Sequence, residues 1–149
     1  MDDLQSLYQE MILEHKRKPR NFHNMDAATQ QADGHNPLCG DQLTLFLRVE
    51  AGIIQEASFQ GSGCAISTAS ASIMTETLAG KTEEEAHQIF QTFHALITDA
   101  PPPEPRAPLG KLAAFEGVKS FPMRVKCATL AWHTLEAALA GKGNAVTTE

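Results

Sequence analysis

The sequence lacks any apolar run that approaches the roughly 18–20 residues needed to span a membrane. Aromatic residues are scarce, at 6% of 149 positions, so a hydrophobic core must consist mainly of Leu, Ile, Ala and Met. The chain begins with the acidic residues Met1-Asp2-Asp3, which differ from the basic start of a secretory signal peptide. We therefore expect a cytoplasmic protein without a membrane segment.

Positive charge is also in short supply. The 12 Lys and Arg residues stand against 18 Asp and Glu residues, which gives a formal net charge of −6. Nucleic-acid binding needs a basic surface that neutralises phosphates, so the composition argues against a DNA- or RNA-binding protein. One basic run, from His15 to Arg20, stands out. We interpret it either as the solvated end of a helix, where cations are favourable, or as a docking site for an acidic partner.

The hydrophobic pattern predicts an α+β fold. Helical spacing of apolar residues predicts an amphipathic helix from Leu4 that ends before Pro19. The polar stretch 21–36 carries only a weak signal for a short edge strand. Strict alternation over 43–49, the turn Ala51-Gly52 and a second strand over 53–60 then predict an antiparallel hairpin.

The second half of the chain is predicted to be helical. Helices are expected over 65–79, 82–97, 109–115 and 122–140, and the proline-rich segment 101–108 forms an extended connector between them. This order predicts a small antiparallel sheet packed against several helices in one domain, 1–149. Residues 142–149 are expected to form a frayed tail.

Cysteine is rare, with only three residues: Cys39, Cys64 and Cys127. Structural disulfides are not expected in a reducing compartment, so the thiols bind metal, take part in chemistry or are simply buried. Each lies near the end of a predicted element, where helix starts and glycine breaks favour a thiolate that can leave the core. Their spacing matches no zinc finger, so a shared site must be assembled by the fold.

If the three thiolates meet Asp41, two residues after Cys39, they form an S₃O site that Zn²⁺ accepts readily. Arg124 lies three residues before Cys127 and shares its helix face, where its charge would stabilise a displaced thiolate. The simpler interpretation of Arg124 is a surface residue of a first helical turn. Two further alternatives are three inert buried cysteines and a Cys–His–Asp hydrolase, although no histidine stands in a nucleophile signature.

Four motifs occur in order along residues 4–139. They are Leu7-Tyr8-Gln9-Glu10 with Pro19-Arg20-Asn21, Asn36-Pro37-Leu38-Cys39-Gly40-Asp41, Gly63-Cys64-Ala65-Ile66-Ser67 and Val125-Lys126-Cys127-Ala128-Thr129-Leu130-Ala131-Trp132. Together they resemble the SufU branch of the NifU/IscU-like iron–sulfur cluster assembly family. Lys126 stands where IscU-type scaffolds carry a histidine, and segment 109–121 is an insertion relative to those scaffolds. Both departures favour the SufU branch.

This resemblance implies a SufE/NifU-like, IscU-like fold and one tightly bound Zn²⁺ per chain. It implies Cys39, Asp41, Cys64 and Cys127 as the zinc ligands, with Cys39 as the persulfide acceptor. It also implies a SufS-type cysteine desulfurase as the sulfur donor, which uses pyridoxal phosphate. A SufB-containing scaffold complex or another acceptor would take the sulfur onward.

The predicted function is therefore zinc-dependent sulfur transfer. Cys39 lies on a glycine-flanked loop whereas Cys64 and Cys127 begin helices, so Cys39 is the thiol expected to leave the metal. Two alternatives stay open. One is a scaffold that builds an iron–sulfur cluster on the same cysteines, which Lys126 disfavours because a protonated ammonium cannot ligate. The other is a zinc-stabilised adaptor without chemistry.

Overall fold

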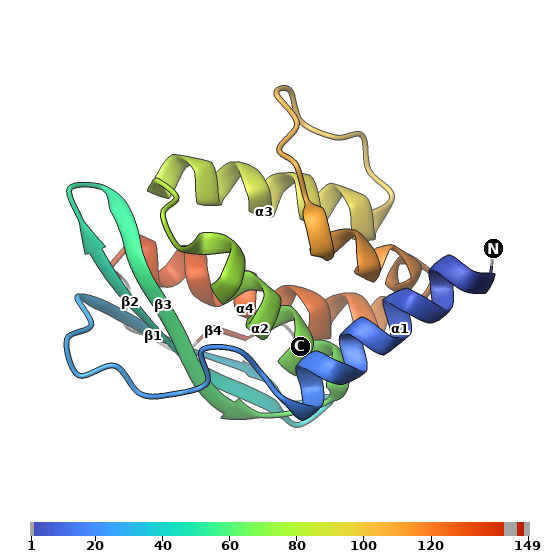
Figure 1. Ribbon diagram of the computed structural model, residues 1–149, viewed down its shortest axis with the longest axis horizontal. Helices are drawn as coiled ribbons and strands as arrows, with labels where there is room; N and C mark the ends of the chain where they lie inside the picture. Colours follow the sequence, from blue (N-terminus) through green and yellow to red (C-terminus); the bar gives the residue numbers. More distant parts are fainter. Residues whose placement is uncertain (1, 142–145, 148–149) are drawn as a thin grey trace.

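A computed structural model describes residues 2–141 and 146–147 (Figure 1). In chain order the elements are α1 (Asp2–Arg17), β1 (Gln30–Asn36), β2 (Asp41–Glu50), β3 (Ile53–Ser62), α2 (Ala65–Leu78), α3 (Glu83–Thr98), the 3₁₀ helix η1 (Gly110–Ser120), α4 (Pro122–Leu139) and β4 (Val146–Thr147). They form the α+β fold that the sequence predicts. Among the described residues, no helix is both long enough and apolar enough to cross a membrane.

The strands form one sheet in the order β3-β2-β1-β4, in which only β4 runs parallel to its neighbour. The β2–β3 turn lies at Ala51 and Gly52, as predicted, with positive φ angles of 55° and 75°. Strand β1 is paired on both sides, whereas the sequence predicts at most a short edge strand there. Its inward-facing residues are Ala32, Gly34 and Asn36, so the usual large hydrophobic side chains are missing from its pattern.

The helices lie on one face of the sheet (Figure 1). Helices α2 and α4 pack on the strands, α1 packs against α2, and α3 and η1 form an outer layer against α4. Helix α4 approaches β1 so closely that a Cβ at Gly34 would lie 2.1 Å from Thr134 Oγ1. Above α4, the ring of Phe93 packs against both Phe115 and Trp132 at centroid distances of 5.8 and 5.5 Å.

Helix boundaries follow their predicted signals. Thr82 and Glu85 form the predicted capping box at the start of α3, with both reciprocal hydrogen bonds present. Pro122 occupies the first turn of α4, where its missing N–H is not needed. Gly80 adopts a positive φ of 84° just after α2.

Three segments differ from the sequence-based expectation. Phe46 alternates with the core-facing leucines of β2 and so lies on the other face of the sheet, yet it is buried. Segment 18–29 crosses that outer face: Phe22 bridges to Phe59 of β3, and the Thr29 N–H donates to the Leu47 carbonyl of β2. Helix η1 continues past Gly117 to Ser120, since Val118 is buried and its packing outweighs the roughly 1 kcal/mol cost of a helical glycine. In the predicted tail, Val146–Thr147 pairs with β1, and residues 142–145 and 148–149 lie outside the described residues.

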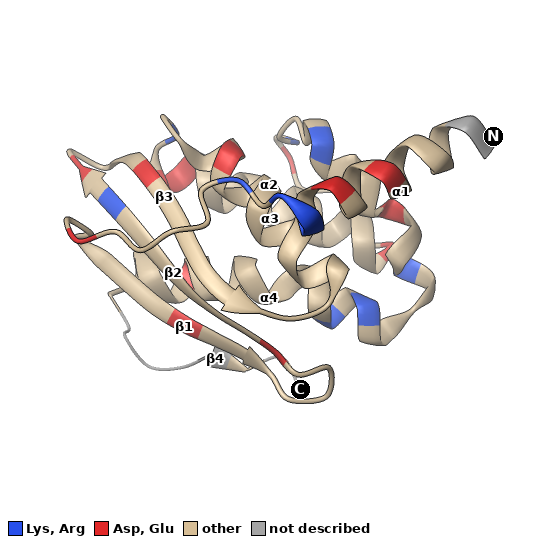
Figure 2. Cartoon of the chain, turned by 60° about the horizontal axis from the view of Figure 1, so that its bottom comes forward, with Lys and Arg blue, Asp and Glu red and all other residues tan. Residues whose placement is uncertain are grey.

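The basic end of α1 is anchored to the core rather than fully solvated. Figure 2 shows Lys and Arg gathered at this end of the helix and in the segment after it. His15 is only 1% exposed, and its Nδ1 lies 2.7 Å from Ser72 Oγ, which also accepts a hydrogen bond from the Arg20 backbone N–H. Lys16 Nζ donates to the Gly63 carbonyl at 2.8 Å. The interpretation as a simple solvated helix end is therefore wrong for His15, whereas Lys16 is exposed and Gly63 accepts its hydrogen bond.

Burial of His15 makes the stability of the fold depend on pH. Burial, followed by the positive charge of Arg20, lowers the pKa of His15 from its ordinary value of 6.5, while Glu76 opposes the shift. The unfolded chain then binds more protons at His15 than the folded chain does. The resulting stabilisation is complete above pH 6.5 and is lost as pH falls toward the lower folded-state pKa.

When the pH falls from about 7.5 to about 5.5, we expect the free energy of unfolding to decrease more for the native protein than for a His15→Gln variant. The difference has an upper limit of about 1.4 kcal/mol, the value for a histidine that stays neutral in the folded state. Urea unfolding of both proteins at the two pH values measures it, and effects of pH on metal binding cancel in the comparison. Identical pH dependence in both proteins would contradict this role of His15.

Candidate metal centre

The four predicted ligand residues come from three parts of the chain that meet at one end of the sheet. Cys39 lies in the turn between β1 and β2, and Asp41 is the first residue of β2. Cys64 is the N-cap of α2, and Cys127 lies in the second turn of α4. The β1–β2 register places Asp41 directly opposite Asn36, so the turn that carries Cys39 is closed at its base.

The side chains of these residues converge. Cys127 Sγ lies 3.3 Å from Cys39 Sγ, and one ligand atom from each of Cys39, Asp41 and Cys127 falls within 4.8 Å of the other two. Cys64 is the outlying member, with its Sγ 3.9 Å from Asp41 Oδ2. The structure therefore brings the predicted residues together, while their action as ligands stays a prediction.

Asp41 is fully buried and has a different neighbour for each carboxylate oxygen. Its Oδ1 accepts a hydrogen bond from the Cys64 backbone N–H at 2.8 Å, which leaves Oδ2 directed toward the thiols. The backbone at Gly63 must come close for this bond to form. A Cβ at Gly63 would lie 2.5 Å from Asp41 Oδ1, so a larger residue there would displace the carboxylate.

The surroundings of the Cys127 thiol oppose the loss of its proton. Burial, and then the neighbouring Asp41 and Cys39, raise the pKa of the Cys127 thiol far above its ordinary value of 9.0. The metal-free cluster therefore keeps Cys127 protonated next to the buried carboxylate. A divalent cation reverses this preference because it stabilises several thiolates at once, and three sulfur donors with one carboxylate suit Zn²⁺.

Asn36 is a site residue that sequence reasoning missed. It is fully buried, and its Nδ2 lies 3.5 Å from Asp41 Oδ2 and 3.7 Å from Cys127 Sγ. The amide therefore contacts two candidate ligands from outside the ligand set. Its place three residues before Cys39 is visible in the sequence, but its role depends on the pairing of Asn36 with Asp41 across β1 and β2.

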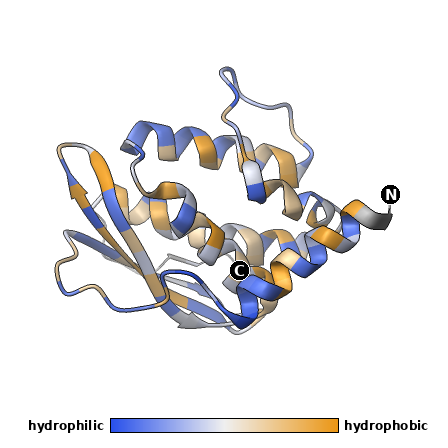
Figure 3. Ribbon diagram, viewed as in Figure 1, coloured by the Kyte–Doolittle hydropathy of each residue, from blue (hydrophilic) through white to orange (hydrophobic). Residues whose placement is uncertain are grey.

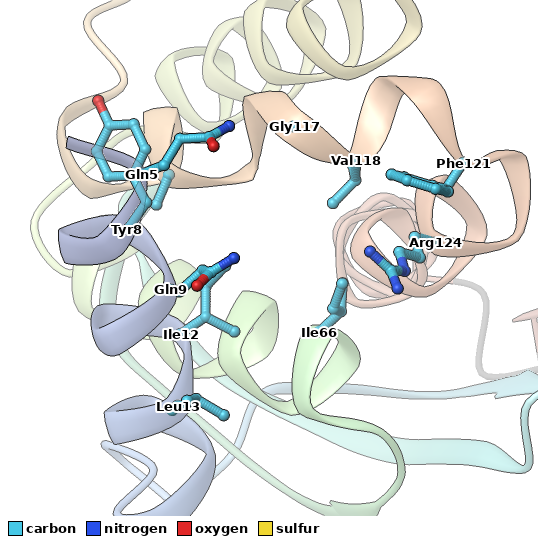
Figure 4. A pocket seen from close by; sticks show the side chains of 11 residues that line it. Gln5, Tyr8, Gln9, Ile12, Leu13, Ile66, Gly117, Val118, Phe121 and Arg124 are labelled. Atoms are coloured by element: carbon cyan, nitrogen blue, oxygen red, sulfur yellow. The ribbon is translucent and has the colours of Figure 1, made fainter. Parts of the chain in front are cut away.

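Arg124 contacts the ring of Phe121 at the start of α4. Its guanidinium sits 4.4 Å from the centroid of the Phe121 ring, and its side chain borders a hollow between α1, η1 and α4 (Figure 4). This geometry fits a cation–π contact. Stabilisation of a freed thiolate by Arg124 stays a prediction.

The histidines also occupy positions that do not favour a hydrolase. His35, the histidine nearest in sequence to a cysteine, is an exposed residue of β1. His133 packs against the ring of Phe90 at a centroid distance of 5.2 Å. The thiols instead contact one another, Asp41 and Asn36, an arrangement that favours metal binding over a Cys–His pair.

Comparison with known proteins agrees with this geometry. Residues 7–140 match the model of the NifU-like N terminal domain. The chain is 37% identical to the zinc-dependent sulfurtransferase SufU of Bacillus subtilis, over 93% of this chain and 92% of that protein. It is 34% identical to the iron–sulfur cluster assembly scaffold protein IscU of Streptococcus pyogenes, over 97% and 90% of the two chains.

A solved structure extends the comparison to the fold. The crystal structure of FiSufU from Fervidobacterium islandicum AW-1, named for iron–sulfur cluster assembly in the SUF system, superposes with a TM-score of 0.81. The two chains share 35% identity, and the match covers 87% of this chain and 94% of the other. This chain therefore belongs to the NifU-like N-terminal domain family, together with the SufU and IscU proteins of iron–sulfur cluster assembly.

Proposed function

We propose that this protein is a zinc-dependent sulfurtransferase of iron–sulfur cluster assembly. It takes sulfur, as a persulfide on Cys39, from a SufS-type cysteine desulfurase and passes it to a SufB-containing scaffold or another acceptor. The observation that carries this proposal is the convergence of Cys39, Asp41 and Cys127 within 4.8 Å, with Cys64 beside Asp41. The similarity to a SufU named as a zinc-dependent sulfurtransferase supports it.

Zinc would be held by Cys39, Asp41, Cys64 and Cys127. When bound, the metal keeps a thiol deprotonated at neutral pH while masking it from reaction with solvent. The protein's contribution is to hold the donor atoms at one end of a rigid sheet. Asp41 is fixed through Oδ1 by the Cys64 N–H, so Oδ2, which faces the thiols, is the oxygen placed to ligate.

Cys39 is the thiol best placed to leave the metal. It is half-buried in a turn next to Gly40, whose φ is +71°, and its N–H makes only a 3.3 Å hydrogen bond to the Asn36 carbonyl. Cys127 is instead buried within α4, and Cys64 Sγ accepts a hydrogen bond from the Ser67 N–H at the start of α2. The turn costs least to move, because few backbone bonds must break.

The transfer step needs no outside oxidant. The Cys39 thiolate attacks the terminal sulfur of the persulfide on the desulfurase, a new S–S bond forms and the donor S–S bond breaks. The donor cysteine leaves as a thiolate, so charge and oxidation state balance across the two proteins. Arg124 would help by placing a positive charge near the freed thiolate.

Exposed apolar side chains around the site support docking of a protein partner. Leu38 next to Cys39 is 56% exposed, and Phe121 and Met123 at the start of α4 are 48% and 52% exposed. Helix α1 carries hydrophobic residues along its length (Figure 3), and Leu13 on it borders the hollow that Phe121 and Arg124 also line (Figure 4). Because Phe and Met are enriched at protein interfaces, these exposed side chains support an interaction surface.

Two related functions make different predictions about the isolated protein. A cluster scaffold would carry iron and sulfide and be brown, and the similarity to an IscU protein favours this as the second candidate. An adaptor without chemistry would hold zinc and accept no sulfur. Lys126, which stands next to Cys127, favours the transferase over the scaffold because an ammonium does not ligate iron.

The first test concerns the metal. We expect aerobically purified protein to be colourless and to hold about one zinc per chain with three sulfur ligands and one oxygen ligand. Removing the zinc with a chelator should lower the unfolding temperature, because the energy of metal binding is also folding energy. Metal analysis, visible absorption and X-ray absorption spectroscopy measure these properties. Two or fewer sulfur ligands would contradict the proposed ligand set.

The second test concerns sulfur acceptance. Replacing Cys39 with Ser should abolish stimulation of the cognate desulfurase and leave most of the zinc and the fold, because water can fill an open zinc position. Replacing Cys64 or Cys127 with Ser should lose zinc and stability together. The measurement is mass spectrometry after incubation with desulfurase and cysteine, which locates the added sulfur atom. Label found on Cys64 or Cys127 and never on Cys39 would disprove the assignment.

The third test concerns Asn36. An Asn36→Leu variant keeps the branching of the side chain at Cγ but removes the amide that contacts Asp41 and Cys127. We expect zinc affinity to fall about 10- to 100-fold, the usual effect of losing a group that orients metal ligands. Competition with a chromophoric chelator measures it, and Gln31→Leu on the exposed side of the same strand is the matched control. Equal affinity in both variants would exclude a role for the amide.

A further inference from the structure

A second group of metal-ligating side chains lies outside the cysteine cluster, where α3 and α4 meet. His87 and His94 of α3 and His133 and Glu136 of α4 border one surface hollow of about 460 Å³. Phe90 and two prolines of the connector, Pro101 and Pro103, also line it. In the sequence, His87 and His94 have the pattern of solvent-facing helix residues, and nothing there connects them with His133. The fold brings three of the six histidines into this one hollow.

The rings of His94 and His133 lie near enough for side-chain rotation to bring both onto one ion. The ring centroids of His94 and His133 lie 6.3 Å apart, with an angle of 76° between the ring planes. Two imidazoles bound to one tetrahedral ion at about 2.1 Å place their ring centroids roughly 5 Å apart, so the two rings must approach each other by about 1 Å to share an ion. Both rings make edge-to-face contacts with Phe90, at 5.8 Å for His94 and 5.2 Å for His133. Phe90 thus holds the two rings side by side.

Glu136 supplies an oxygen donor beside this pair. It follows His133 by three residues, so the two side chains lie on the same face of α4, one turn apart. Its Oε1 is in hydrogen-bond contact with Nδ1 of His87. The four side chains therefore form a row in the order His87, Glu136, His133, His94 along the contact between the two helices.

We propose that His94, His133 and Glu136 bind a divalent transition-metal ion of the zinc class in this hollow, independently of the cysteine centre. Imidazole and carboxylate donors suit Zn²⁺, whereas the hard ions Mg²⁺ and Ca²⁺ prefer oxygen donors alone. In the part of the chain that the structure describes, only the Cys39, Asp41 and Cys127 donors already lie within 4.8 Å of one another. The second site therefore forms when side chains rotate on two fixed helices and Glu136 turns from His87 toward His133.

The site would link the outer helix α3 to α4, which lies against the sheet. Binding to the folded protein alone stabilises it by mass action, so the unfolding temperature should rise with zinc beyond the first equivalent. This effect needs neither a desulfurase nor sulfur transfer. The proposal can therefore fail or succeed separately from the proposed function.

The test uses protein already loaded with one equivalent of zinc and titrates it with further Zn²⁺. Equilibrium dialysis with metal analysis should show a second bound equivalent, and a His94→Gln, His133→Gln double variant should bind it at least tenfold more weakly. Because His94 is exposed, the single His94→Gln variant is expected to fold normally and to show the same loss. Nitrogen-15 NMR of the imidazoles should show zinc-dependent shifts for His94 and His133.

His23→Gln is the matched control, since His23 is exposed and bonds to the carbonyl of its neighbour Asn24. It should retain the second equivalent with unchanged affinity. The proposal is overturned if no second equivalent binds at millimolar free zinc. It is equally overturned if the second equivalent binds the double variant as tightly as the native protein, or if the control loses it too.

Discussion

The hydrogen bond from the Cys64 N–H to Asp41 Oδ1 is the contact on which the candidate metal centre depends. It joins the start of β2 to the start of α2 and uses one of the N–H groups that a helix leaves unpaired at its first turn. The same bond directs Oδ2 of the buried carboxylate toward the thiols. It requires the close approach of the backbone at Gly63, which explains why the residue before Cys64 has no side chain. One backbone contact thus positions two candidate ligands from different elements.

Much of this fold can be predicted from the sequence because its signals are local. The capping box at Thr82, the proline at the start of α4 and the Ala51-Gly52 turn each act through neighbouring residues, and each is confirmed. Strand β1 is different. Its inward positions hold Ala32, Gly34 and Asn36 because α4 packs very close to it and because Asn36 contacts Asp41 and Cys127. Where packing or function replaces the large apolar side chains, the strand pattern disappears from the sequence.

The candidate site, like the fold, can be predicted only in part from the sequence. The three cysteines and Asp41 are conspicuous by their chemistry and their places at element ends, so they can be selected before the fold is known. Their convergence cannot be predicted in this way, because it depends on long-range contacts. These are the register that sets Asn36 opposite Asp41 and the packing of α4 that brings Cys127 to Asn36. The role of Asn36 cannot be predicted from the sequence for a related reason. An amide gains a role toward Cys127, distant in the sequence, only when tertiary contacts place it there.

Helix α4 connects the two groups of donors that the structure brings together. Cys127 lies on the side of the helix that meets Asp41 and Cys39, whereas His133 and Glu136, further along, face α3. The six-residue separation of Cys127 and His133 places them roughly 120° apart around the helix, and Glu136, nine residues after Cys127, lies about 180° away from it. The donor chemistry differs too, since buried thiols with a carboxylate suit a metal held for long times, and half-exposed imidazoles suit one that exchanges with solvent. Because Glu136 lies opposite Cys127 on a helix that is packed against the sheet, an ion in the outer hollow would bind on a different side of α4 from the cysteine centre.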